Sequence, residues 1–159
     1  MRHIIITAAT IVLLTTQVTW AQKQPPMKPT APGTRGEPAW QGVVRASDGR
    51  TFITDGGLAI DAAIAKPAKL PARELAAKVL EGYLAAAHKA EYSLSELRVA
   101  EPSKTYASPN GVLLNATYID YLRKILPAST VRLRMTGDMQ PVVIAANGTA
   151  VGVLMPVKK

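Results

Sequence analysis

The clearest pattern of hydrophobic and polar positions lies near the C-terminus. Residues 130–136 alternate, with Val131, Leu133 and Met135 on one face and two arginines between them. The runs 141–146 and 149–155 are apolar, and Asn147-Gly148 joins them. Asn-Gly between two apolar runs is a strong hairpin signal, because both central residues of a type I′ turn need positive φ. The pattern predicts a three-stranded antiparallel meander over 130–155, which Pro156 ends because proline cannot donate to a β-ladder.

Two segments have helical periodicity instead. The first spans 72–88, and its predicted core face holds Leu75, Val79, Leu80, Tyr83, Leu84 and Ala87. The second spans 115–126, and its predicted core face holds Tyr118, Ile119, Leu122, Ile125 and Leu126. Asn115 is a good N-cap for this helix, and Pro127 ends it.

Shorter apolar runs between turn signals predict the remaining strands, at 42–46, 51–54, 58–64, 94–100, 104–107 and 112–114. The element order then becomes β-β-β-α-β-β-β-α-β-β-β, which divides into two similar βαβ-type halves. This order predicts a single α+β domain, with both helices packed on one side of an antiparallel sheet.

The N-terminus has the three-part layout of a secretory signal peptide. A short basic start, Met1-Arg2-His3, precedes an uncharged apolar and threonine stretch from 4 to 18, and Thr19-Trp20-Ala21 places small residues at a cleavage site. We therefore expect a signal peptide over 1–21, and the alternative is an uncleaved membrane anchor. Residues 22–39 are rich in proline and predict a disordered linker. The folded domain is expected over 40–159.

Composition narrows the choice of partners. The chain of 159 residues has no cysteine, which excludes disulfides and thiol chemistry. Its formal net charge of +8 suggests an acidic partner such as nucleic acid, anionic lipid or a cell-wall polymer. The alternative is that the excess of lysine and arginine only aids solubility.

The sequence gives little support for catalysis. Its two histidines are His3, in the signal, and His88, at a predicted helix end. It contains no nucleophile-and-base pattern, no metal-ligand spacing and no glycine-rich phosphate loop. We expect a protein that is not an enzyme and that needs no cofactor and no metal. An apolar C-terminal tail beside a sheet edge suits a binding groove better.

Several of these segments resemble a known family. The Asn-capped helix from Asn115 to Leu126 is followed by Val131-Arg-Leu133, by Pro141-Val-Val-Ile144, and by Val153-Leu-Met-Pro-Val-Lys158. This succession resembles the C-terminal domain of the bacterial DNA polymerase III β sliding clamp, which ends in Met-Pro-x-Arg. Residues 54–59, followed by Leu70-Pro71 and a helix, are similar to a second clamp element. Gly152 stands where the family commonly has an aromatic residue.

The resemblance implies specific sites. Clamp domains are modules of two helices and antiparallel strands, whose helices line a ring around DNA. Partner proteins insert a Gln-Leu-x-Leu-Phe-like peptide into a pocket partly built by the Met-Pro tail. It implies a peptide pocket at Val153, Leu154, Met155, Pro156 and Val157, with Thr54 and Leu58. The charge of the predicted helix faces, independently of the resemblance, suggests phosphate contacts by Arg73, Lys78, Arg123 and Lys124.

The expected function is therefore that of a non-enzymatic binding module, a clamp-like processivity factor that binds a partner peptide and, as a second partner, DNA. The alternative is an exported cell-envelope protein that uses the same fold to bind a peptide or a polyanion. The signal peptide predicts export to the periplasm or cell envelope, whereas a clamp role requires the cytoplasm. A homo-oligomer is a further expectation.

Overall fold

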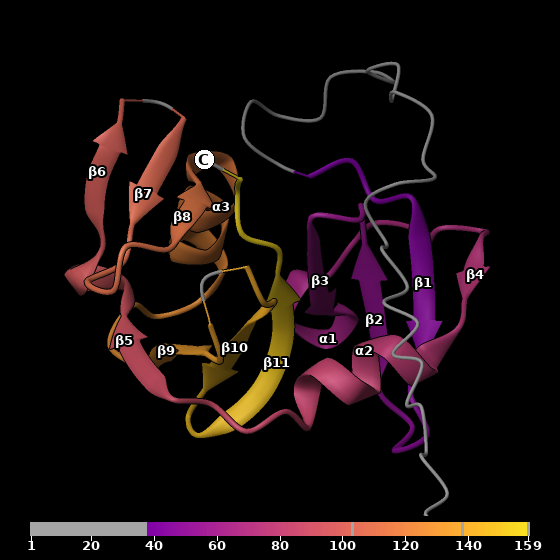
Figure 1. The fold of residues 1–159 in the computed structure, drawn as a ribbon. Coiled ribbons are helices and arrows are strands. Elements are labelled where there is room, and N and C mark those ends of the chain that lie inside the picture. Colours follow the sequence, from indigo (N-terminus) through magenta and orange to yellow (C-terminus); the bar gives the residue numbers. More distant parts are fainter. Residues whose placement is uncertain (1–37, 103, 138, 159) are drawn as a thin grey trace, which may run out of the picture.

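A computed structural model describes residues 38–102, 104–137 and 139–158 (Figure 1). The predicted signal peptide and residues 22–37 of the predicted linker lie outside these residues. The described part is an α+β fold, as expected. Its elements are β1 (Gly42–Arg45), β2 (Thr51–Thr54), β3 (Leu58–Asp61), α1 (Ala62–Ala65), β4 (Glu74–Leu75), α2 (Ala77–Leu84), β5 (Ala90–Ser93), the 3-10 turn η2 (Leu94–Glu96), β6 (Arg98–Glu101), β7 (Thr105–Ala107), β8 (Leu113–Asn115), α3 (Ala116–Ile125), β9 (Val131–Met135), β10 (Val142–Ala146) and β11 (Thr149–Leu154).

The main sheet has eight strands in the order β4-β1-β2-β3-β11-β10-β9-β5. The predicted meander β9-β10-β11 is confirmed, and Asn147 and Gly148 have the positive φ values, 50° and 80°, that the hairpin requires. β11 also pairs antiparallel with β3, which joins the N-terminal strands to the meander. The expectation of a wholly antiparallel sheet is wrong at one edge, because the short β4 runs parallel to β1.

A second sheet has three strands in the order β6-β7-β8. Figure 1 shows β6 and β7 projecting from the body of the molecule. α3 follows β8 directly, and the side chain of Asn115 accepts a hydrogen bond from the Thr117 amide at 2.9 Å, which confirms the predicted N-cap.

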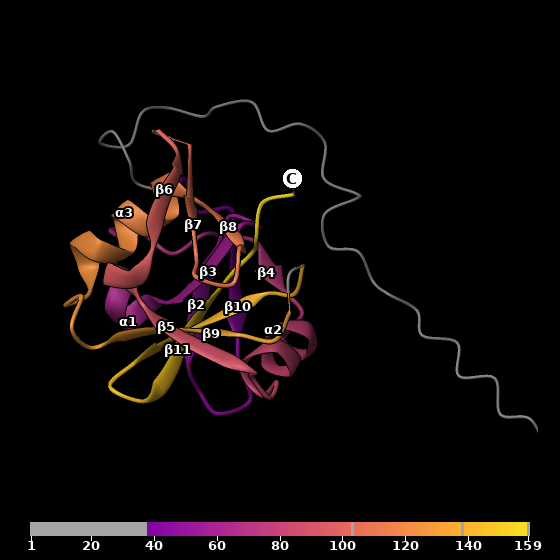
Figure 2. The same ribbon diagram turned by 60° about the vertical axis from the view of Figure 1, so that its left-hand side comes forward.

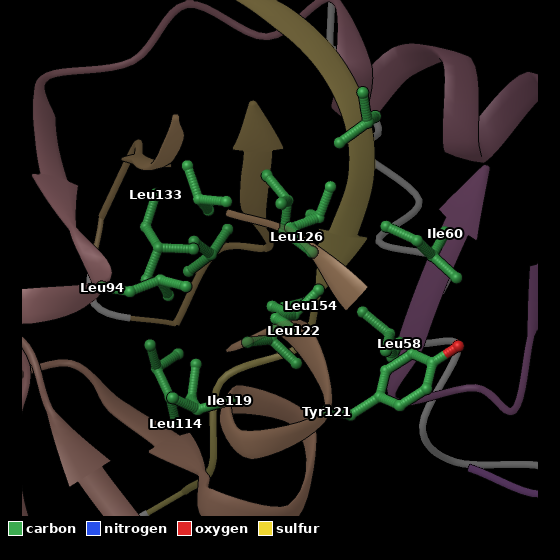
Figure 3. Packing of buried hydrophobic residues seen from close by; sticks show 14 of the residues in the cluster. Leu58, Ile60, Leu94, Leu114, Ile119, Tyr121, Leu122, Leu126, Leu133 and Leu154 are labelled. Carbon is green, nitrogen blue, oxygen red and sulfur yellow. The ribbon is translucent and has the colours of Figure 1, made fainter. Parts of the chain in front are cut away.

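The two longer helices lie on opposite faces of the main sheet, which corrects the expectation that both pack on one side. α3 packs into the larger core, where Ile119 and Leu122 lie beside Leu154 (Figure 3). α2 packs through Leu80 on a smaller cluster that contains Val153 and Phe52. Val153 and Leu154 are consecutive residues of one strand, so their side chains point to opposite faces. Figure 2 shows the sheet between α2 and the pair α1 and α3.

Several predicted boundaries change: the first predicted helix ends at Leu84 instead of 88, and the predicted strand over 94–100 begins with the turn η2. Two further changes have a clear cause in the backbone. The first predicted helix loses its N-terminal turn because the chain before it pairs with β1, where the Val43 amide donates to the Arg73 carbonyl at 2.8 Å. The predicted strand over 58–64 ends at Asp61, whose carboxylate accepts a hydrogen bond from the Ala63 amide and starts the short helix α1. Both changes follow from backbone pairing and capping that apolar periodicity does not report.

Candidate functional site

An apolar pocket lies between α2 and the face of the main sheet that this helix covers. Its volume is about 30 Å³. The lining comes from β1, from β2 and the turn after it, from β3, from α2 and from the C-terminal strand and tail. The lining residues are Val44, Thr54, Gly56, Gly57, Leu58, Ala59, Leu80, Tyr83, Val153 and Met155.

A tight turn between β2 and β3 forms one wall of the pocket. Asp55 organises it: one carboxylate oxygen accepts hydrogen bonds from the amides of Gly57 and Leu58, both at 2.9 Å. The Thr54 hydroxyl accepts from the Gly56 amide at 3.0 Å, and Gly56 has a φ of 93°, which suits glycine. The side chains of Thr54 and Asp55 therefore satisfy the turn's own amides.

The same carboxylate joins this turn to the opposite face of the sheet. Its second oxygen accepts a hydrogen bond from the Tyr118 hydroxyl of α3 at 2.8 Å. Burial raises the pKa of Tyr118 well above its ordinary value, and the nearby Asp55 charge raises it further. Tyr118 therefore stays protonated and keeps donating. A Cβ at Gly57 would run into the Tyr118 hydroxyl, so a larger residue here would have to displace that side chain.

The C-terminal tail forms the facing wall. The Met155 amide donates to the Gly57 carbonyl at 2.8 Å, and two residues later the Val157 amide donates to the Leu113 carbonyl of β8 at 2.8 Å. The tail thus bridges the end of the main sheet and the small sheet. Pro156, between these two donors, has no amide hydrogen to offer on the other side of the tail.

The structure brings four of the seven residues predicted for a peptide pocket to its lining, Thr54, Leu58, Val153 and Met155. The Leu58 side chain is buried in the larger core on the opposite face, so this residue lines the pocket through its backbone. Leu154 instead lies fully buried in the larger core on the opposite face. Pro156 and Val157 are partly buried beyond the pocket and do not line it.

Sequence reasoning missed the contributions of β1 and α2 to this pocket. The sequence did indicate that both residues are buried: Val44 lies in a predicted apolar strand, and Leu80 lies on the apolar face of a predicted helix. What the sequence did not reveal was that these two faces meet at the turn after β2.

The four cations predicted to contact phosphate are not brought together. Arg73 and Lys78 are exposed beside and on α2, whereas Arg123 and Lys124 belong to α3 on the opposite side of the sheet. The guanidinium of Arg123 lies 4.6 Å from the Tyr106 ring centroid and donates to the Leu94 carbonyl at 3.1 Å. This arginine therefore has a structural role in holding α3 against its neighbours.

A wider, more polar hollow lies beside the C-terminal turn of α2 and the turn after β1, with a volume of about 310 Å³. The Ser47 amide donates to the Glu81 carboxylate there at 2.6 Å, which ties α2 to the turn after β1. This bond lowers the pKa of Glu81 below its ordinary value. Arg50 is paired with Asp48 and donates to the Ala150 carbonyl at 2.6 Å. The charged side chains of this hollow are thus bonded to neighbouring segments of its own lining.

Within the residues that the structure describes, no group of three or more histidine, aspartate or glutamate side chains is placed to hold a metal ion. No helix in the same part of the chain has the length and apolar character needed to cross a membrane.

Comparison of the chain with protein-family models, with curated proteins and with solved structures found no match.

Proposed function

We propose that this protein is a non-enzymatic module that binds a partner peptide by taking one of its apolar side chains into the pocket between α2, the turn after β2 and the C-terminal tail. One observation carries the proposal. Residues distant in sequence, Thr54 on one side and Val153 and Met155 on the other, line a single apolar pocket. These are residues that the resemblance to sliding clamps implies for peptide binding.

The chemistry of the walls favours an apolar side chain. The lining holds no charged residue and has two residues with a hydroxyl, Thr54 and Tyr83; the Thr54 hydroxyl accepts a hydrogen bond from the Gly56 amide. The volume of about 30 Å³ admits a small group in the present conformation. A larger anchor requires the partly exposed side chains of Met155 and Tyr83 to rotate, and methionine adapts readily because it is flexible and polarizable.

The magnitude of such an interaction is modest. Burying one leucine side chain contributes about 1.5–3 kcal/mol. Affinity beyond the millimolar range, which needs more than about 4 kcal/mol, therefore requires additional contacts by the peptide outside the pocket. The outer side of the tail is a poor place for an added strand because Pro156 has no donor. We therefore expect recognition by side-chain insertion and weak binding.

We propose neither DNA binding nor assembly into a ring for this protein. The four cations are divided between two faces, and Arg123 already stacks on Tyr106. Helices on opposite sides of the sheet also differ from the arrangement that the clamp resemblance implies.

The test is a titration of a fluorescent Gln-Leu-x-Leu-Phe-type peptide against the protein and two matched variants. Ala59→Leu places a larger side chain in the pocket and should abolish binding. Ala63→Leu makes the same change at an exposed site on α1 and should leave binding intact. Deleting residues 155–159 should also abolish binding while the meander stays folded. Equal affinity for all variants, or no binding by the intact protein, contradicts the proposal.

We propose separately that the protein is exported. The signal peptide predicted over 1–21 supports export, with the mature chain beginning at Gln22. Cell fractionation and N-terminal sequencing decide the point, and a cytosolic protein that retains its leader would rule export out.

A further inference from the structure

β6 is an edge strand with an open side. It pairs with β7, and no other strand of the described residues pairs with it. All four of its residues, Arg98 to Glu101, are exposed, and Val99 is the most exposed large hydrophobic residue of the described part, at 61%. An edge of this kind offers backbone donors and acceptors to another strand.

The register of β6 contains a bulge that fixes which side chains share a face. Arg98 lies opposite Ala107, and Glu101 lies opposite Thr105. Ala107 and Thr105 are two residues apart on β7 and so point to the same face. Arg98 and Glu101 therefore share that face, although a regular strand would place them on opposite faces. Val99 lies opposite Tyr106, on the other face.

This arrangement is self-complementary. A two-fold axis normal to the sheet, passing between Val99 and Ala100, places β6 antiparallel to β6 of a second copy. Arg98 of each copy then lies opposite Glu101 of the other, on the same face, where Glu101 also pairs with Lys104 of its own chain. The two Val99 side chains flank the axis on the opposite face. A bulge disfavours pairing with a regular strand. A second copy carries the same bulge, so the two strands match.

We propose that this protein self-associates by antiparallel pairing of β6 with β6 of a second copy, in the register that sets Arg98 opposite Glu101. The charges favour this register, because an axis through Arg98 or through Glu101 would place like charges opposite each other, and an axis through Val99 or Ala100 would leave neither charge opposite its counterpart. The paired segment is only four residues long. The dimer is therefore weak, with a dissociation constant below about 1 mM but far above that of a standard-size interface.

Sedimentation velocity on the full chain, from about 10 µM to 1 mM at low salt, measures the association. Arg98→Glu and Glu101→Arg each create two like-charge pairs per dimer, and each should weaken self-association roughly tenfold or more. Mixing these two variants should restore association, because every charged pair across the axis is then opposite in sign. The double reversal should restore it within one chain. Arg45→Glu, at an exposed site on β1, is the matched control: it breaks the ion pair with Glu74 inside one chain and should leave self-association unchanged.

Circular dichroism checks that each variant stays folded. A chain that remains monomeric at 1 mM overturns the proposal. So does a dimer that is indifferent to both reversals, or a pair of variants that fails to associate when mixed.

Discussion

Replacing Asp55 by alanine should be one of the most damaging single changes in this protein. Asp55 is buried, with only 7% of the residue exposed, and its carboxylate accepts three hydrogen bonds. Two come from the amides of Gly57 and Leu58 and one from the Tyr118 hydroxyl. The substitution removes the acceptor and leaves all three donors in place.

The expected loss follows from these contacts. A buried donor left without a partner costs about 1–3 kcal/mol, and bonds to a charged acceptor lie near the upper end. Gly56 is exposed, so the turn can relax and water can reach part of it. We therefore expect Asp55→Ala to lower the free energy of unfolding by about 3–5 kcal/mol, against a total of about 5–15 kcal/mol for a domain of this kind.

Urea unfolding followed by circular dichroism and tryptophan fluorescence measures this loss. Tyr118→Phe is the matched control, because it removes one donor and keeps both amide bonds, so it should cost only about 1–2 kcal/mol. The two effects should be non-additive, since they share one hydrogen bond. A loss below about 1 kcal/mol for Asp55→Ala would refute the argument that this carboxylate organises the turn.

Three further predictions concern stability. Leu122→Ala should lower the free energy of unfolding by about 2–5 kcal/mol in the same urea assay, because Leu122 is fully buried in the larger core; a loss under 1 kcal/mol would contradict that packing. Gly152→Val should destabilise the protein, and a thermal melt should show a lower Tm, because a Cβ there lies 2.5 Å from the Ala59 carbonyl oxygen; an unchanged Tm would show that β3 and β11 can separate at no cost. Above pH 10 the unfolded chain should ionise Tyr118 before the folded chain does, since its folded pKa is raised above the ordinary value of 10.0. The contribution of Tyr118 is thus full below pH 10 and declines above it, so Tyr118→Phe should flatten the alkaline fall in stability, and identical profiles for the two proteins would argue against the raised pKa.

The local elements with strong backbone signals were predictable from the sequence. Asn147-Gly148 fixed its hairpin because few residue pairs adopt positive φ at both positions, and the alternation over 130–136 placed β9. Asn115 and Pro127 bounded α3 to within a residue at each end. Each of these residues restricts the backbone at its own position, so its effect does not depend on how the rest of the chain folds.

The candidate pocket was predictable only in part. The tail resemblance pointed to Val153 and Met155, which line it, but also to Leu154, which does not. Strand alternation alone requires consecutive residues to face opposite ways. It does not say which face carries α2, and that choice decides which tail residues reach the pocket.

Tertiary structure decided the rest, because those features depend on pairing between distant segments. The pairing of β3 with β11 brings residues 54–59 beside 153–155, and it explains Gly152, whose missing side chain lets the two backbones approach. In the assembled sheet α2 and α3 lie on opposite faces, each packed on the apolar side chains of its own face. An amphipathic pattern states that a helix has a face to bury, but only the assembled sheet determines against which surface that face is buried.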